Sequence, residues 1–472
     1  VGLRDDISEP YPPSHYQSGR KRSFMRFGLH TQSGPAEEGE RDYQDLQRFL
    51  RDPFLSGDEE IRIMRPVAIT GIGIVAPSGI GKRQFWANIK AGRSFIKLIT
   101  RFDSGLYPSH IAGQIDDLDA YTHVSERLLK KMDAFSHMAL ISSEMALQDA
   151  GVDIQKEDPN LVGIFLGNAI GGWLYAETEL RDLYREGREG VSPYMASAWF
   201  PAAPQGQVSI YYGIKGFSKT VVSDRASSLM ALGYAGKTLG KDKLNLILAG
   251  GMEAPVTPYA LLCCNTYGCL SKNNAHPQDA YRPFDRKRDG FVIGEGAGIM
   301  VLENIERAKA RGATIQALIS GYGTTCDGKD RISPDTDGKE LARAIKIALD
   351  EAKASPDKID YISLDGLACA DWDLGEINAL KQVFGDKAKT IPASCPKSMF
   401  GNLLGASGAV DVITAVLSME HNLVPPTINL DEPAVNGLNY VTGISREHKI
   451  NQALVISRGR GGINSALIIE RP

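Results

Sequence analysis

The stretch VAITGIGIVAPSG, residues 67–79, is a short apolar segment that runs into a glycine-containing turn. QALISGYGTTCDG at 316–328 repeats this pattern, and LNLILAGGMEA at 244–254 is repeated by QALVISRGRGG at 452–462. Around these segments, apolar strand patterns alternate with helical ones, which is typical of layered α/β proteins. Because each pattern occurs twice, we expect two related halves rather than two unrelated domains.

The two halves are predicted to comprise residues 64–315 and 316–472. Residues 1–63 are charged and rich in Pro, Gly and Ser, so we expect an N-terminal extension that is partly irregular. Within it, DYQDLQRFLRDPFL at 42–55 predicts one short helix, since its apolar residues share a helical face.

Composition excludes several classes of function. The 472-residue chain is 43% hydrophobic and 23% charged with a net charge of -4, so there is no basic field that would attract nucleic acid. The six cysteines show neither disulfide nor zinc spacing, so we expect reduced thiols and no metal site. No apolar run approaches the roughly 20 residues of a membrane helix, and the first residues lack the apolar core of a signal peptide. We therefore expect a cytoplasmic protein that does not bind a membrane.

The segment VVSDRASSLMALGYAGKTL, 221–239, predicts a short strand that leads directly into a small-residue helix. Such a joint often presents a nucleophile, because the first turn of a helix carries partial positive charge and lowers the pKa of a thiol. Here the joint holds Arg225, which cannot act as a nucleophile and whose charge opposes the helix dipole.

Four blocks carry a resemblance to a known family: VAITGIGIVAPSG, YRPFDRKRDGFVIGEGAGIMVLE, ASCPKSMFGNLLGASGAVD and SRGRGGINSALII. In this order they resemble the β-ketoacyl synthases of fatty acid and polyketide synthesis. The resemblance spans nearly all of Met64 to Pro472. It implies the thiolase fold, a layered αβαβα architecture built from two duplicated halves.

The resemblance also identifies the positions that carry chemistry in an active synthase. The acyl-accepting cysteine corresponds to Arg225, the two histidines to Asp365 and Asn402, and the supporting lysine to Lys397. Arginine cannot form a thioester, an aspartate anion donates no hydrogen bond, and asparagine cannot shuttle a proton at neutral pH. We therefore expect a degenerate active site and no enzymatic activity in the isolated chain.

Further motifs resemble the chain-length factors, or β subunits, of type II polyketide synthases. These are AGQIDDL, GREGVSPYMASAWF, LDGLA and RGRGG. The subfamily carries a non-nucleophilic residue at the cysteine position, commonly glutamine, where this chain has Arg225. The resemblance implies a heterodimer with a ketosynthase α subunit, which forms acyltransferase complexes of the 3-oxoacyl synthase type. It implies no cofactor, because substrates arrive on the phosphopantetheine arm of an acyl carrier protein, expected to dock mainly on the ketosynthase.

In this subfamily the growing polyketide extends into a tunnel at the subunit interface. GGWLYAETELRDLY at 171–184 resembles the helix that limits the tunnel, and Trp173, Ala176 and Leu180 in it are spaced to share one helical face. With Tyr259 as a weaker fourth, they are the predicted tunnel-lining residues. The alternative is that this face is only packed core.

Two further predictions concern contacts. The strand FSKTVVS, which precedes the joint, corresponds by resemblance to the strand through which the family pairs. The alternative is an internal strand, and both can hold, because a strand edge can be used only on assembly. Arg225 is expected to be neutralised by Asp365, with Asp224 or Glu295 as second choices. A buried ion pair is favourable only when well hydrogen-bonded, and removing one partner can cost about 3–5 kcal/mol.

Other residues have structural interpretations. Cys369 and Cys395 are expected to be buried inert thiols, and Asp285 and Glu295 to brace loops. Two alternative functions stay open at this point. One is an enzyme, either a malonyl-carrier decarboxylase or a thiolase-like enzyme that relies on Lys397 and Asn402. The other is a homodimeric acyl-binding protein without chemistry.

Overall fold

The computed structural model describes residues 65–116, 118, 124–241 and 243–472. The predicted extension at 1–63 and its helix lie outside the described residues. The main feature is a 12-stranded sheet. Its hydrogen-bonded order is β14 (Asn439–Tyr440), β12 (Pro392–Ser394), β11 (Tyr361–Ser363), β16 (Gln452–Gly459), β17 (Ile463–Glu470), β10 (Ala317–Cys326), β1 (Val67–Ala76), β9 (Gly296–Asn304), β7 (Leu246–Glu253), β5 (Val162–Gly167) and β6 (Ser218–Val221), with β2 (Gly79–Ile80) paired to β1.

The sheet repeats one strand order on the two sides of its centre. Going outward, β1-β9-β7-β5-β6 corresponds to β10-β17-β16-β11-β12. β1 and β10 pair antiparallel, with Val67 opposite Ile319. Each also has an irregularity at the same place, between Ile69 and Gly71 and between Ile319 and Gly321. The predicted duplication is therefore confirmed.

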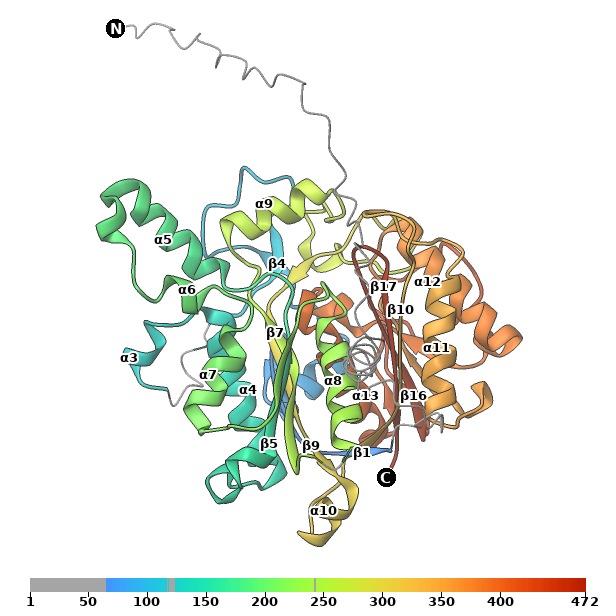
Figure 1. The fold of residues 1–472 in the computed structure, drawn as a ribbon. Coiled ribbons are helices and arrows are strands. Elements are labelled where there is room, and N and C mark those ends of the chain that lie inside the picture. Colours follow the sequence, from blue (N-terminus) through green and yellow to red (C-terminus); the bar gives the residue numbers. More distant parts are fainter. Residues whose placement is uncertain (1–64, 117, 119–123, 242) are drawn as a thin grey trace, which may run out of the picture. The chain divides into compact units, whose positions relative to one another are not determined.

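Helices form three layers around the two halves of the sheet (Figure 1). α8 (Ser227–Leu239) and α13 (Ser407–His421) pack on each other in the middle layer. α4 (Ala134–Ala150) and α7 (Ala203–Tyr212) cover the outer face of the first half, and α11 (Lys339–Glu351) and α12 (Ala370–Phe384) cover that of the second. This is the predicted αβαβα arrangement.

The remaining elements are short or lie at the periphery. The helices among them are α2 (Lys82–Lys90), α3 (Glu126–Leu129), α5 (Trp173–Glu186), α6 (Met195–Ala198), α9 (Pro258–Tyr267) and α10 (Ile305–Ala310). β3 (Lys97–Leu98), β4 (Ile111–Gly113) and β8 (Ile293–Gly294) form a small sheet, and β13 (Leu423–Val424) pairs with β15 (Arg446–Glu447). Within the described part of the chain, no helix is both long and apolar enough to cross a membrane.

Glycines explain how closely the outer helices approach the central strands. A Cβ placed on Gly73 of β1 would lie 1.8 Å from the carbonyl oxygen of Ser142 in α4. A Cβ on Gly323 of β10 would lie 2.0 Å from the carbonyl oxygen of Ala344 in α11. The glycines of the two repeated sequence stretches thus have the same packing role in each half.

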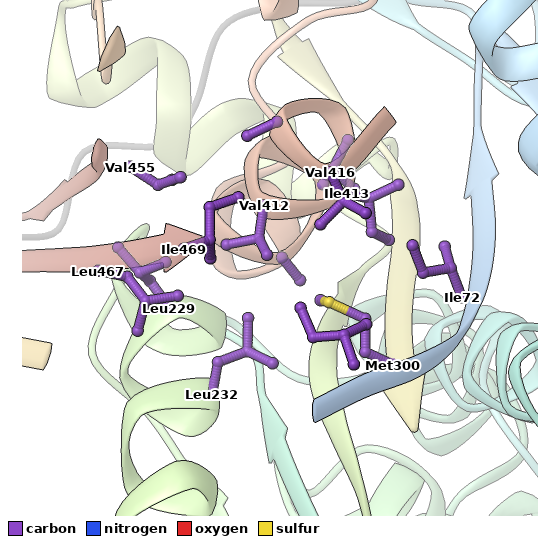
Figure 2. Close-up of a cluster of buried hydrophobic side chains, with 14 of the residues drawn as sticks. Ile72, Leu229, Leu232, Met300, Val412, Ile413, Val416, Val455, Leu467 and Ile469 are labelled. Carbon is purple, nitrogen blue, oxygen red and sulfur yellow. The ribbon is translucent and has the colours of Figure 1, made fainter. Parts of the chain in front are cut away.

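The largest core cluster fills the middle layer (Figure 2). Leu229 and Leu232 of α8 face Val412 and Val416 of α13 in this core, and all four are fully buried. Ile72 and Met300 from the first half of the sheet and Val455, Leu467 and Ile469 from the second complete it. α8 is therefore packed against α13 and against strands of both halves of the sheet. Ala226, the residue immediately before α8, is fully buried.

Candidate functional site

The strand-to-helix joint is where the sequence predicts it. β6 ends at Val221 and α8 begins at Ser227, so Arg225 lies in the turn between them. Asp224 has φ 51°, the left-handed conformation that side chains other than glycine seldom adopt. The Arg225 carbonyl accepts a hydrogen bond of 2.9 Å from Ser457 Oγ on β16, which ties the turn to the second half of the protein.

The Arg225 side chain is only 1% exposed and makes few polar contacts. Nη1 donates to Asp224 Oδ2 at 3.2 Å, whereas Nε and Nη2 have no hydrogen-bond partner among the described residues. The guanidinium carbon lies 4.6 Å from the centre of the Trp372 ring, within the range of a cation–π interaction. Burial lowers the pKa of Arg225, but Asp224 and then Asp365 more than offset this, so the pKa stands above its ordinary value.

The predicted first partner of Arg225 was wrong. Asp365 Oδ1 accepts from the backbone N–H of Arg458 at 3.3 Å, so it influences Arg225 only through its charge. Glu295 was wrong as a second choice because it holds Arg101 through two hydrogen bonds, of 2.6 and 2.8 Å. The other second choice, Asp224, is correct. It precedes Arg225 in the chain, and the strained turn brings the two side chains together.

A second buried arginine lies on the same aromatic ring. Arg458 is 1% exposed, and its guanidinium carbon is 4.9 Å from the centre of Trp372. Its Nη1 donates to the Trp372 carbonyl at 2.7 Å. Sequence reasoning missed Trp372, whose only signal was a large aromatic residue close after Asp365 in the chain. Arg458 is the first residue of the RGRGG motif, for which the sequence predicted no contact of its own.

Lys397 is fully engaged in structural contacts. Its Nζ lies 2.7 Å from Asp411 Oδ2 and donates to the carbonyls of Leu364 and Asp365 at 3.1 and 3.0 Å. Burial lowers the pKa of Lys397, but Asp411 outweighs burial and the pKa is raised. Two of the three N–H donors of the ammonium are thus used by backbone carbonyls, and its charge is paired with the Asp411 carboxylate.

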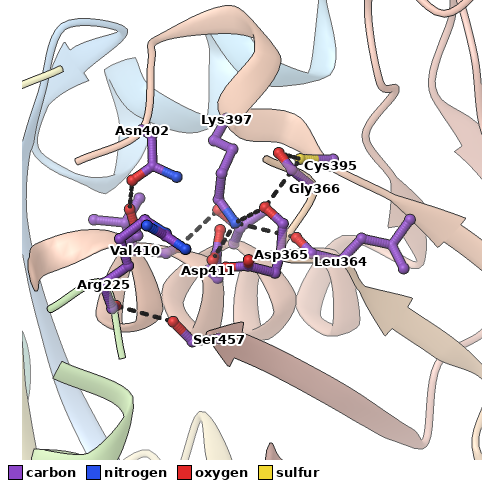
Figure 3. A network of polar contacts seen from close by, with 12 residues as sticks. Arg225, Leu364, Asp365, Gly366, Cys395, Lys397, Asn402, Val410, Asp411 and Ser457 are labelled. Atoms are coloured by element: carbon purple, nitrogen blue, oxygen red, sulfur yellow. Dashed lines mark hydrogen bonds and ion pairs between the residues drawn. The ribbon is translucent and has the colours of Figure 1, made fainter. Parts of the chain in front are cut away.

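Asn402 is likewise held in place. Its Oδ1 accepts from Leu404 N–H and from Ser407 Oγ, both at 3.0 Å, and its Nδ2 donates to the Tyr281 hydroxyl at 3.5 Å. The Tyr281 hydroxyl donates to the Gly366 carbonyl at 2.9 Å. Figure 3 shows the side chains of Arg225, Asp365, Lys397 and Asn402 in one cluster, so the structure brings the four predicted site residues together.

A buried carboxyl group supports the Asp365 loop from behind. Glu376 of α12 accepts from the N–H groups of Asp365 and Gly366 at 2.8 and 3.0 Å. Burial, followed by the charge of Asp365, raises the pKa of Glu376 to about 8. Two acidic residues, Asp365 and Glu376, therefore lie next to each other at this loop.

The thiols near the site differ from one another. Cys395 is buried, its Sγ donates to the carbonyls of Asp365 and Gly366 at 3.7 Å, and burial raises its pKa well above the ordinary value. It is the inert thiol that was predicted. Cys369 is only half-buried, contrary to the prediction, and it contacts Cys269, which the sequence analysis did not consider.

The predicted tunnel-lining residues lie on α5 and α9. The Trp173 ring centre is 4.5 Å from that of Tyr259, and Ala176 is buried. Leu180 is 40% exposed and Tyr259 is 45% exposed, so the interpretation of this face as packed core does not hold for them. Their role in a tunnel stays a prediction.

The two loop-bracing predictions agree with the structure. Besides Arg101, Glu295 accepts from the backbone N–H of Ile115 at 2.8 Å. Asp285 accepts from the backbone N–H groups of Asp431 and Glu432, both at 2.9 Å. Both carboxylates therefore join segments that are distant in the chain. No group of three or more His, Cys, Asp or Glu side chains in the described part of the chain could hold a metal ion.

Comparison with known families matches one domain in each half of the chain. The β-ketoacyl synthase N-terminal domain matches residues 64–308, and the C-terminal domain matches residues 316–431. The chain belongs to the β-ketoacyl synthase family. Its two halves are the two thiolase-like halves of that fold.

Relatives of this β-ketoacyl synthase family member include a polyketide synthase beta subunit and a 3-oxoacyl-(acyl-carrier-protein) synthase. The chain is 39% identical over 408 residues to the tetracenomycin polyketide synthase ketoacyl synthase beta subunit of Streptomyces glaucescens, which covers 86% of this chain and 98% of that protein. It is 35% identical over 408 residues, with 86% and 99% coverage, to 3-oxoacyl-(acyl-carrier-protein) synthase 2 of Coxiella burnetii. Among solved structures, the ishigamide ketosynthase/chain length factor superposes with a TM-score of 0.80 at 29% identity, covering 87% of this chain and 100% of that one.

Proposed function

We propose that this protein is a non-catalytic chain-length factor of a type II polyketide synthase. It pairs with a separate ketosynthase α subunit that carries the acyl-accepting cysteine, and it shapes the tunnel for the growing chain. The observation that carries this proposal is the buried Arg225 at the joint where an active synthase has its nucleophile. Arginine forms no thioester, and its side chain fills the interior position that a thioester would need.

The other site positions support the same conclusion. Lys397 is buried in an ion pair with Asp411 and donates to two backbone carbonyls, and Asn402 is held through both its oxygen and its nitrogen. A decarboxylase would need groups that turn toward a malonyl thioester and stabilise the developing enolate. Nothing in this geometry favours the decarboxylase alternative.

The surface fits a subunit that pairs with a partner. Most exposed large apolar side chains lie on α5, α7, β6, α9 and the segments next to them, with Leu180, Tyr184, Ile210, Phe217 and Val222 among them. β6 is also the last strand of the sheet and pairs only with β5 within the described residues. Exposed apolar patches and open sheet edges are typical of surfaces that become buried on assembly.

In the proposed complex, the substrate arrives on the phosphopantetheine arm of an acyl carrier protein, and this subunit needs no cofactor. Trp173, Ala176, Leu180 and Tyr259 are the proposed tunnel-lining residues. The Trp173 ring contacts that of Tyr259, Leu180 and Tyr259 are exposed, and the small Ala176 is buried on the same helix as Trp173 and Leu180. The similarity to a ketoacyl synthase beta subunit and to a ketosynthase/chain length factor structure supports this assignment.

Co-expression with a ketosynthase that has an intact cysteine tests the proposal. Size-exclusion chromatography with light-scattering detection is expected to give a one-to-one complex of the two chains. A stable homodimer of this chain that decarboxylates malonyl-carrier protein without a partner would contradict the proposal.

A further inference from the structure

Two cysteines that are distant in the sequence lie in contact beside the degenerate site. Cys369 Sγ is 3.7 Å from the carbonyl oxygen of Cys269, 100 residues away in the chain, and the two thiols are within hydrogen-bonding reach of each other. Cys269 follows α9, and Cys369 immediately precedes the first residue of α12. Both are half-buried, so a small reagent can reach them, unlike the buried Cys395.

The surroundings of Cys269 favour its thiolate form. The pKa of Cys269 is lowered to about 7. The largest cause is the hydrogen bond from Cys369, which outweighs the opposite effect of burial, and the positive charges of Arg225 and Arg460 lower the pKa further. Tyr267 also contributes to lowering the pKa of Cys269, and the Arg460 guanidinium lies 4.2 Å from the centre of the Tyr267 ring. A thiolate in an electropositive, partly exposed site is the reactive form of cysteine.

The second thiol has the opposite character. Its hydrogen bond to Cys269, burial and the charge of Cys269 raise the pKa of Cys369, and Asp373 on the first turn of α12 adds to this effect. The contact therefore combines an anionic sulfur that can attack with a protonated one that can resolve the product. Two equivalent thiols would not divide the roles in this way.

We propose that Cys269 and Cys369 form a reactive dithiol that closes reversibly to a disulfide by exchange with a low-molecular-weight disulfide. In the first step, the Cys269 thiolate attacks one sulfur of the small disulfide, a mixed disulfide forms, and one small thiolate leaves. In the second step, Cys369 gives its proton to that thiolate and attacks Cys269 Sγ, which expels the second small thiolate. The protein loses two electrons, the small disulfide gains them, and solvent protonates the last thiolate.

The disulfide would act directly on the Arg225 environment. Cys369 is the capping residue of α12, and Trp372, which stacks on Arg225, lies in the first turn of that helix. A covalent bond to Cys269 would therefore tie the start of α12 to the segment after α9. This inference does not depend on the proposed chain-length function.

Oxidised glutathione is the probe for the test, applied to the full chain at pH 8 and followed by acid quenching, alkylation and peptide mapping. The wild-type protein is expected to lose two titratable thiols, to give one cross-linked peptide that contains Cys269 and Cys369, and to regain both thiols with dithiothreitol. Cys326→Ser is the matched control, because Cys326 is an exposed cysteine outside the pair. It is expected to form the same cross-link at the same rate.

Single variants separate the two roles. Cys369→Ser is expected to accumulate a glutathione adduct on Cys269, because the resolving thiol is missing, whereas Cys269→Ser is expected to react at least tenfold more slowly. An unchanged thiol count in the wild type, a cross-link between other cysteines, or an adduct that forms faster on Cys369 than on Cys269 would overturn the proposal.

A pH–rate profile adds a readout that does not depend on disulfide formation. Alkylation of Cys269 by iodoacetamide is expected to rise with a midpoint near the pKa of about 7, and Arg460→Ala is expected to move the midpoint upward. Arg460 is exposed, so this variant leaves the core intact. The groups that face the thiol pair are Arg225, Arg460, Tyr267, Asp373 and the two cysteines themselves. A midpoint that stays the same in Arg460→Ala would contradict the electrostatic activation of Cys269.

Discussion

The Arg225 guanidinium is a buried cation with one hydrogen bond to the residues that the structure describes, so its stability depends on few contacts. A buried charge is tolerated only when partners compensate for its lost hydration. Here these partners are Asp224 at 3.2 Å and the face of Trp372. The guanidinium of Arg458 also lies over the Trp372 ring, so one aromatic ring contacts two buried cations.

Asp224→Asn tests this dependence at the level of one side chain. Asparagine tolerates the left-handed conformation of residue 224, so the substitution removes charge without adding backbone strain. The free energy of unfolding in urea is expected to fall, by less than the about 3–5 kcal/mol of a fully buried pair because the Asp224 side chain is 17% exposed. In the double variant Asp224→Asn/Arg225→Gln the loss is expected to be smaller than the sum of the single losses. Additive losses would show that the two residues do not interact.

Glu376 gives a second prediction, through pH. Its folded-state pKa of about 8 lies above the ordinary value of about 4.3, so the folded protein keeps a proton that the unfolded chain releases. This contribution to stability is therefore complete at low pH and is lost as the pH rises from about 4.5 through 8. In Glu376→Gln the decrease in the free energy of unfolding between pH 5 and pH 8 is expected to become shallower.

Urea unfolding at several pH values measures this slope. Asp386→Asn is the control, because Lys389 lowers the pKa of that exposed carboxylate and places its titration below the window. An unchanged slope in Glu376→Gln would mean that Glu376 is ionised throughout this range in the folded protein.

At the scale of secondary-structure elements, the duplicated glycines fix the distance between sheet and outer helices. Gly73 and Gly323 occupy corresponding positions on β1 and β10 and face carbonyl oxygens of α4 and α11. Backbone atoms of a packed helix cannot give way as a flexible side chain can. Overpacking of this kind typically costs about 1–3 kcal/mol.

Gly73→Ala and Gly323→Ala are therefore both expected to lower the free energy of unfolding, measured by thermal unfolding, by at least about 1–3 kcal/mol. Gly206 of α7 is the matched control, because a Cβ there meets no atom within 4 Å. Gly206→Ala is expected to be neutral or to stabilise the helix by up to about 1 kcal/mol. Equal effects of all three substitutions would contradict the packing role of the two strand glycines.

These elements were largely predictable because their signals are local. The repeated strand-and-glycine stretches predict β1, β10, β7 and β16, and the structure has strands there. The position of Arg225 at a strand-to-helix joint was also readable from residue types. The partner of Arg225 could not be read from residue types. The choice between Asp224 and Asp365 depends on the directions of their side chains, and these are determined by the packing of β16 against the Asp365 loop.

At the scale of the whole molecule, contacts between the two halves create the site. Arg225 comes from the first half, whereas Trp372, Lys397 and Arg458 come from the second. Sequence patterns cannot place residues so far apart in contact, and only the resemblance to a family brought Arg225, Asp365, Lys397 and Asn402 together in advance. Trp372 and Cys269 carried no motif and were therefore missed.

The exposed edge strand gives a prediction about assembly. Val222 directly follows β6 and is 53% exposed, so a charge there should hardly change the folding of the chain. In Val222→Asp, the complex with a ketosynthase is expected to weaken at least tenfold in light-scattering titrations, while the thermal midpoint of the isolated chain stays within a few degrees. Ile332→Asp is the control, an apolar residue of the other half that is 63% exposed. Equal complex formation by wild type and Val222→Asp would exclude β6 from the interface.

The most direct test of the central claim is the condensation rate of the reconstituted complex with malonyl-carrier protein, measured after changing each subunit separately. Replacing the partner's active-site cysteine is expected to abolish turnover, whereas Arg225→Gln in this chain is expected to leave the condensation rate within about threefold, once circular dichroism has shown that the variant is folded. Turnover that persists without the partner's cysteine, or that is lost in a folded Arg225→Gln complex, would contradict the account of this chain as the non-catalytic subunit.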